Sequence, residues 1–295
     1  TLAKMSIKHP VIAVTGSSGA GTTTVKTAFE HICRRLNVKP SIVEGDSFHR
    51  YDRKEMRKQL KAAKKENRNL SHFGPEGNLF DKQYELFDSY GETGTGLRRY
   101  YIHNEEEAEL RGAAPGTFTD WEPLPTDTDL LFYEGLHGGV ITDEHDICDK
   151  VDLLIGIAPT INLEWIQKIK RDTEERGYER EAVVDVIYRR LHDYIHYIVP
   201  QFSRTHINFQ RSALVDTSDP FIGREIPTPE QSQVIIHFLN PDVSDEYKLQ
   251  LKGLIEGTTI TGFNTLVIPG TRMTYALELI LAKRIAELLK KRGHL

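Results

Sequence analysis

The chain has 295 residues, of which 39 % are apolar and 27 % charged, which is typical of a folded, water-soluble protein. Its net charge of −5 gives no support to a nucleic-acid partner. Two cysteines are too few for a disulfide framework, no apolar run approaches the roughly 20 residues of a membrane span, and no signal peptide is evident. We therefore expect a cytoplasmic protein with no membrane partner.

Short apolar segments alternate with helical ones along the chain. In order, we expect a strand at 10–15, a helix at 22–36, a strand at 41–44, an exposed charged helix at 52–67, long functional loops over 91–128, strands at 130–133 and 151–157, helices at 161–176 and 180–198, strands at 234–238 and 266–268, and a closing helix at 274–290. This alternation predicts an α/β layered fold around a mostly parallel sheet, with an antiparallel edge from the later strands. We expect one domain over residues 5–295, with residues 1–4 a cloning remnant before Met5.

A glycine-rich motif joins the first predicted strand to the first predicted helix. It consists of Gly16, Ser17, Ser18, Gly19, Ala20, Gly21, Thr22 and Thr23. This is the P-loop pattern, in which backbone amides and a helix N-terminus bind nucleotide phosphates and the final hydroxyl, here Thr23, ligates Mg²⁺. Thr22 replaces the usual lysine, so another cation must neutralise phosphate charge. The alternative is a glycine-rich turn without a ligand.

Asp46 follows the second predicted strand, at the edge where doubly wound sheets bind ligands. That position suits a general base that takes a proton from an acceptor hydroxyl. The alternative is that Asp46 caps the next helix. His49 and Arg53 are four residues apart and would share a helix face. They would grip an anionic substrate group, or else form a solvated charge pair.

Glu134 ends the apolar strand over 130–133, as the acid of a Walker B strand does. Its carboxylate would hold the metal ion or its water. Many buried strands end in an acid without such a role, so the assignment depends on the P-loop upstream.

Four charged residues fall on one face of the predicted helix over 161–176. They are Lys168, Arg171, Asp172 and Arg176. We predict a lid whose cations contact phosphates, with Asp172 binding metal or orienting the transferred group. A closing lid excludes water. The alternative is an ordinary solvated helix face.

Arginines and rings gather in the loop-rich segment at Arg98, Arg99, Tyr100, Tyr101 and His103. They suit a polyol or a phosphate, or a contact between subunits. Arg189 and Arg190 suit an effector site, an interface or the surface.

The motifs GSSGAGTT, EGDSFHR, LFYEGLHG, INLEWIQKIKRD and PQFSRTHINFQR together resemble the bacterial phosphoribulokinases, from Lys8 to about Leu289. The resemblance implies a P-loop nucleoside-kinase-like fold and the ATP- and Mg²⁺-dependent phosphorylation of ribulose 5-phosphate at its C1 hydroxyl, in the Calvin cycle. It also implies a homo-oligomer, with NADH as a candidate allosteric effector.

The resemblance assigns roles to individual positions. Asp46 matches the catalytic base, Asp172 a second essential acid, Glu134 the Walker B acid and Lys168 the lid lysine. The sugar phosphate would be handled by His49, Arg53, Arg171 and Arg176, with Tyr101 and His103 nearby; Arg35, Arg189 and Arg190 are candidates for regulation or assembly. Two rivals stay open: a kinase of the same superfamily that acts on another acceptor such as uridine, and a non-catalytic nucleotide or NADH sensor.

Overall fold

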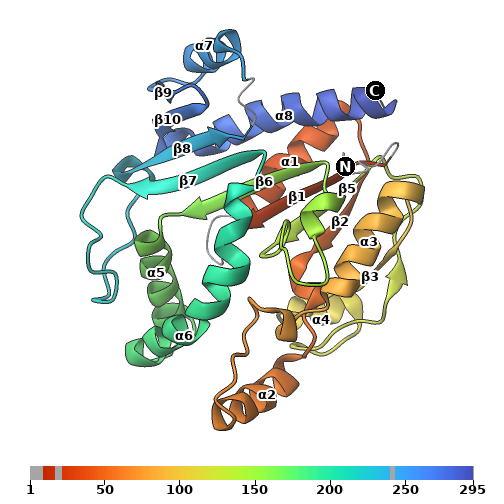
Figure 1. The fold of residues 1–295 in the computed structure, drawn as a ribbon, viewed down its shortest axis with the longest axis vertical. Helices are drawn as coiled ribbons and strands as arrows, with labels where there is room; N and C mark the ends of the chain where they lie inside the picture. The colour runs from red at the N-terminus through yellow and green to blue at the C-terminus, as the bar shows by residue number, and fades with distance from the viewer. Residues whose placement is uncertain (1–8, 17–21, 240–242, 295) are drawn as a thin grey trace.

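The computed structural model describes residues 9–16, 22–239 and 243–294. Its centre is an eight-stranded sheet in the order β2-β5-β1-β6-β7-β8-β10-β9 (Figure 1). The strands are β1 (Val11–Gly16), β2 (Pro40–Glu44), β5 (Leu130–Gly135), β6 (Leu153–Pro159), β7 (Ile207–Ala213), β8 (Ser232–Phe238), β9 (Thr259–Gly262) and β10 (Thr265–Pro269). The neighbouring strands β2, β5, β1, β6 and β7 are parallel to one another. The strands β8, β10 and β9 continue the sheet with antiparallel pairing. The expected mostly parallel α/β sheet with an antiparallel edge is confirmed.

Helices cover both faces of the sheet (Figure 1). They are α1 (Thr22–Leu36), α2 (Arg53–Lys65), α3 (Phe80–Thr93), α4 (Glu105–Arg111), α5 (Ile161–Lys170), α6 (Arg180–Asp193), α7 (Asp245–Leu254) and α8 (Met273–Arg292). The two helices predicted over 161–176 and 180–198 are present, but each ends in a π-helical turn, Arg171–Glu175 and Tyr194–Ile198.

Several elements were not predicted. The helices α3 and α7 and the strands β7 and β9 fall where no element was expected. The expected long loops over 91–128 contain α4 and a small hairpin of β3 (Leu97–Arg98) and β4 (Glu122–Pro123). The strands β7 and β9 mix apolar with polar residues and so give a weak strand signal. For α3 the sequence does carry a helical stripe of buried residues, which sequence reasoning overlooked.

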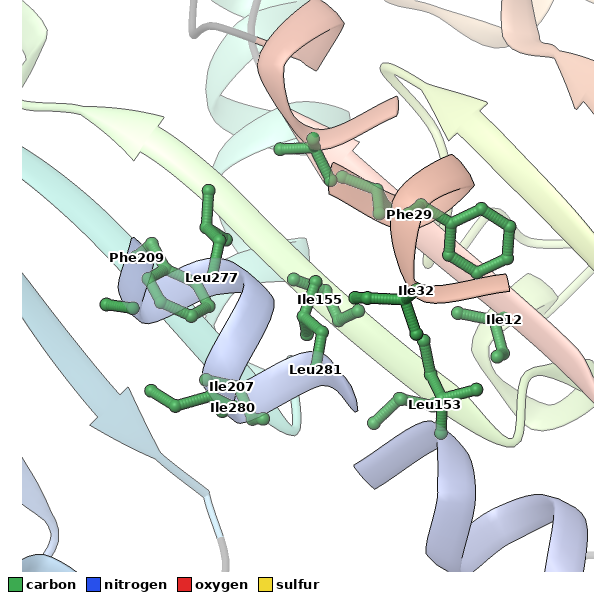
Figure 2. Packing of buried hydrophobic residues seen from close by; sticks show 14 of the residues in the cluster. Ile12, Phe29, Ile32, Leu153, Ile155, Ile207, Phe209, Leu277, Ile280 and Leu281 are labelled. Atoms are coloured by element: carbon green, nitrogen blue, oxygen red, sulfur yellow. The ribbon is translucent and has the colours of Figure 1, made fainter. Parts of the chain in front are cut away.

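The side chains of β1 alternate between two cores because successive residues of a strand point to opposite faces. Ile12 and Val14 join α1 and α8 in the larger core, which Figure 2 shows from close by. Val11 and Ala13 join α3 in the second core. With all six residues buried, β1 lies at the centre of the molecule and fixes where its carboxyl end emerges.

An aromatic stack fastens α1 to the sheet. The rings of Phe29 on α1 and Phe132 on β5 lie 3.7 Å apart at 12°, and both are fully buried. This contact holds α1, the helix that follows the predicted phosphate loop, against β5, the strand that carries Glu134.

We predict that Phe29→Ala lowers the free energy of unfolding by about 3–5 kcal/mol, because it removes a buried ring and leaves a cavity beneath α1. Phe263→Ala is the matched control, since that ring is 67 % exposed, and its effect should stay within about 0.5 kcal/mol. Urea denaturation of both variants measures the difference. Equal effects would contradict the assigned packing of α1.

Candidate active site

Asp46 lies just after β2, in the short 3-10 helix η1 (Gly45–Phe48). Two histidines hold its carboxylate: His103 Nε2 lies 3.0 Å from Oδ2, and His49 Nε2 lies 3.3 Å from Oδ1. Burial alone would raise the pKa of Asp46, but the hydrogen bonds from His103 and His49 outweigh it and hold that pKa well below its ordinary value. The side chain is 44 % exposed, so an ionised carboxylate is open to an incoming hydroxyl.

The alternative in which Asp46 caps a helix is wrong. Asp52 caps α2, accepting a backbone N–H of the first turn at 2.7 Å. His49 precedes that helix with extended backbone angles, so His49 and Arg53 do not share a helix face as predicted. Arg53, at the start of α2, contacts the other histidine instead, donating from Nη2 to the carbonyl of His103 at 3.1 Å.

Tyr101 packs near both histidines that contact Asp46. The centre of its ring lies 6.4 Å from that of His49 and 4.9 Å from that of His103. His103 Nδ1 contacts Glu107 Oε2 at 3.0 Å. The hydrogen bond to Asp46, opposed by burial and reinforced by the bond to Glu107, raises the pKa of His103 to about 9. The site therefore pairs an ionised carboxylate with a cationic imidazolium at neutral pH.

Arg99 fixes the backbone of the turn that carries Asp46. Its guanidinium donates from Nε to the carbonyl of Ser47 at 2.8 Å and from Nη2 to the carbonyl of His49 at 2.6 Å. It also stacks 3.7 Å from the centre of the Phe118 ring. The sequence suggested a substrate or subunit contact for this arginine, and the structure shows it bonded to the turn.

Asn78 orients the second histidine. Its Nδ2 donates to the carbonyls of His72 and Gly74 at 2.9 and 2.8 Å, which leaves Oδ1 as the acceptor for His49 Nδ1 at 3.0 Å. His49 is thereby turned with Nε2 toward Asp46. Sequence reasoning missed Asn78, because nothing in the spacing links residues 49 and 78.

The segment over 70–78 also connects the Asp46 side of the site to α6. Ser71 Oγ donates to Asp193 Oδ2 at 2.6 Å. The His72 ring lies 4.3 Å from that of His49, and burial together with the charges of His49 and Arg190 holds the pKa of His72 well below its ordinary value. His72 is therefore a neutral ring placed between the base and α6.

Asp172 is the common partner of the three predicted lid cations. The distances from its carboxylate oxygens are 2.6 Å to Lys168 Nζ, 3.2 Å to Arg171 Nε and 3.1 Å to Arg176 Nη1. Its side chain is only 8 % exposed. Burial would raise the pKa of Asp172, but the bond from Lys168 and the other cations lower it, so it stays ionised. The four residues meet as expected, over a helix end and a π-turn.

Arg190 adds a fourth cation to this cluster. Burial first, and then the charge of Arg190, lowers the pKa of Lys168. The Arg190 guanidinium lies 5.3 Å from the centre of the ring of Phe73, the residue that follows His72. The sequence suggested an effector or interface role for Arg190, and the structure places it beside the Asp172 cluster and against Phe73.

Glu134 lies where the Walker B comparison predicts, at the carboxyl end of β5 beside β1. It is paired in register with Val14 of β1 and with Glu44 of β2. Val14 belongs to the core beneath α1, and Glu44 pairs with Lys26 of α1 at 3.2 Å, so Glu134 lies on the α1 face of the sheet. A carboxylate there, next to the β1–α1 connection, fits a Mg²⁺ ion held between protein and nucleotide phosphates.

The predicted phosphate loop lies mostly outside the described residues. Gly16 ends β1, and Thr22 and Thr23 begin α1. The predictions for Ser17, Ser18, Gly19, Ala20 and Gly21, and for the side chains of Thr22 and Thr23, concern parts of the chain that the structure does not describe.

The fold and the site together define a phosphoryl-transfer enzyme of the P-loop kinase class. A glycine-rich sequence joins β1 to α1, an ionised acid ends β2, and a cluster of cations faces the same edge of the sheet. A family model described as the phosphoribulokinase / uridine kinase family matches residues 11–218.

Relatives extend this match to nearly the whole chain. The chain is 55 % identical to the chromosomal phosphoribulokinase of Cupriavidus necator over 98 % of both chains, and 52 % identical to a probable phosphoribulokinase of Escherichia coli over 97 % of this chain and 98 % of that one. The solved phosphoribulokinase from Rhodobacter spheroides superposes with a TM-score of 0.89 at 47 % identity, covering 98 % of this chain and all of that one. The chain therefore belongs to the phosphoribulokinase / uridine kinase family and is a kinase, which confirms the resemblance seen in its motifs.

Glu107 is the contact of His103 that sequence reasoning missed. A signal was present, because Asn104 followed three residues later by Glu107 is typical of a helix start, and α4 begins there with Asn104 as its cap. No pattern in the sequence indicated that the same glutamate would reach back to a histidine.

We predict that Arg99→Lys lowers turnover by about 10-fold or more while leaving the KM for ATP nearly unchanged, because an ammonium group cannot reproduce the planar fork that holds the Asp46 turn. Arg57→Lys makes the same chemical change at an exposed position of α2 and serves as the control. Steady-state kinetics of both variants decide the matter. Wild-type turnover in Arg99→Lys would show that the fork does not position the base.

Proposed function

We propose that this kinase transfers the terminal phosphoryl group of ATP to the C1 hydroxyl of ribulose 5-phosphate, giving ribulose 1,5-bisphosphate and ADP. The observation that carries the proposal is the ionised Asp46 between His49 and His103, with the Arg53 guanidinium bonded to the His103 carbonyl. A base surrounded by cationic and polar groups suits an acceptor that brings a phosphate of its own. The names of the full-length relatives support the same substrate.

In this account Asp46 accepts the hydrogen of the acceptor hydroxyl while that oxygen forms its bond to phosphorus and the bond to ADP breaks. Phosphoryl transfer passes through a loose transition state, so positioning and charge contribute more than covalent chemistry. The acceptor would lie among His49, Arg53, Tyr101, His103, Arg171 and Arg176. Its phosphate would be bound by the arginines, because both ring nitrogens of each histidine already have protein partners. Charge-assisted hydrogen bonds to a phosphate are strong and directional.

We assign ATP phosphates to the residues from Gly16 to Thr23 and Mg²⁺ to Thr23 and Glu134. Bound Mg²⁺ would neutralise charge on the phosphates. The described residues contain no group of three His, Cys, Asp or Glu side chains that could form a metal site, and a Mg²⁺ shared with nucleotide phosphates needs only one or two protein ligands. Lys168 and its neighbouring cations would supply the charge that a lysine at residue 22 would otherwise bring.

The wider assignments are part of the same proposal. The eight-stranded sheet contains both β1, near the start of the chain, and β10, near its end, which supports one catalytic domain over residues 5–295. Both cysteines are free, which supports a reducing cytoplasm, and among the described helices none is long and apolar enough to cross a membrane. A homo-oligomeric state, NADH as effector and a place in the Calvin cycle rest on the family resemblance.

We predict that Arg53→Ala raises the KM for ribulose 5-phosphate by about 10- to 150-fold, the equivalent of one charge-assisted hydrogen bond of about 1.5–3 kcal/mol. His49→Ala should also raise it, because the Asp46 carboxylate then loses a partner and repels the phosphate more strongly. The KM for ATP should change little. Lys54→Ala removes a neighbouring exposed cation of α2, pointing about 100° away around the helix, and is the control. An ATP-coupled assay measures all three variants.

The same assay compares acceptors. Ribulose 5-phosphate should be phosphorylated far better than ribulose or uridine, which offer no phosphate to this cluster. Efficient turnover of uridine, or unchanged sugar-phosphate KM values in both truncations, would leave a kinase whose acceptor is not ribulose 5-phosphate.

A further inference from the structure

Glu107 accepts two hydrogen bonds from one residue. Its Oε2 lies 2.8 Å from the backbone nitrogen of His103 and 3.0 Å from that residue's Nδ1. Glu107 is the third residue of α4, and its own backbone N–H bonds to the side chain of the capping residue Asn104 at 2.9 Å. Both the carboxylate and the helix turn that carries it are thus fixed relative to His103.

The other ring nitrogen of His103 faces the catalytic acid. Nε2 lies 3.0 Å from Asp46 Oδ2, so the imidazole bridges two carboxylates. Ionised carboxylates accept hydrogen bonds and donate none, so a bridging ring that satisfies both must carry a hydrogen on each nitrogen. The geometry by itself therefore requires the imidazolium form.

The acids at α4's start differ in what they do. Glu105, Glu106 and Glu107 all lie in its first turn, where acidic residues stabilise a helix through its dipole. Glu105 and Glu106 are exposed, whereas Glu107 is half-buried and bonded to His103. Because Asn104 already caps the helix, the contact from Glu107 to the histidine is additional to what α4 needs to begin.

We propose that Glu107 is a positioning residue for phosphoryl transfer: through His103 it aims an N–H at Oδ2 of Asp46 and keeps that ring charged. The carboxylate of Asp46 is then held in one orientation for the acceptor hydroxyl. The inference rests on the proposed function in one respect, namely that Asp46 is the base. It assigns to an acid outside the family motifs quoted above a role that passes through the histidine.

The proposal has a pH signature. The raised pKa of His103, about 9, means that the bridging form is present below that pH and is lost above it. Replacing the Glu107 carboxylate by a neutral amide removes one of the two anions that favour the charged ring, so the bridge is lost at lower pH. The other groups that face the ring are Asp46, the Tyr101 ring and, at its carbonyl, Arg53.

The test compares Glu107→Gln with Glu106→Gln, which removes the same charge from the same helix turn without touching His103. Turnover at saturating ATP and acceptor is measured from about pH 6 to pH 9.5. In Glu107→Gln the alkaline limb of the kcat profile should move down by about one pH unit, with near wild-type turnover at the acidic end and an unchanged KM for ATP. Glu106→Gln should follow the wild type throughout.

Two outcomes overturn the proposal: a Glu107→Gln profile that superposes on that of Glu106→Gln, and one lowered by the same factor at every pH, which would indicate a structural role alone. If Glu107→Gln does not fold, Glu107→Asp keeps the charge and should keep the alkaline limb of the wild type; a shifted limb there overturns the proposal. NMR titration of the His103 ring in wild type and Glu107→Gln needs no acceptor. If the wild-type enzyme does not phosphorylate ribulose 5-phosphate, the proposed substrate is refuted. If the pKa of His103 is equal in both proteins, the role of Glu107 is refuted.

Discussion

The site depends on the fixing of one ionised carboxylate at the end of β2. Asp46 is bonded by His103 at one oxygen and approached by His49 at the other. Each histidine is in turn fixed from a different part of the chain, His103 by Glu107 of α4 and His49 by Asn78 of the segment before α3. Segments far apart in the sequence must therefore be folded before the Asp46 carboxylate has its orientation.

This arrangement also constrains the chemistry. A carboxylate whose pKa is held well below its ordinary value binds a proton weakly. Any contribution of Asp46 to the reaction therefore cannot come from basicity alone. In a loose transition state the attacking hydroxyl gains little charge before phosphorus–oxygen bond formation, and orientation of that hydroxyl is what the enzyme most needs to supply. We infer that the two histidines make Asp46 a weaker base and at the same time fix the orientation of its carboxylate. The predicted lid has a related arrangement, since the Asp172 carboxylate holds Lys168, Arg171 and Arg176 close together.

Much of this could be predicted from the sequence, for physical reasons that differ from element to element. The strands at 10–15 and 130–133 were recognisable because continuous apolar runs are typical of strands buried on both faces. Asp46, Glu134 and the predicted lid residues were proposed as site residues because they follow such strands or repeat at helical spacing. Asn78, His72 and Glu107 were not, because their roles come from contacts across the fold. The expected common helix face of His49 and Arg53 was wrong, since Asp52 starts α2 later than spacing alone suggested.

The central claim, that Asp46 orients and deprotonates the acceptor hydroxyl, is tested most directly by Asp46→Asn. The amide nearly preserves the shape of the side chain but is a far poorer proton acceptor. We predict a fall in kcat of about 10²–10⁴, or roughly 3–5 kcal/mol of barrier, with ATP binding measured by calorimetry largely intact. A folded Asp46→Asn enzyme with near-normal kcat would contradict the account.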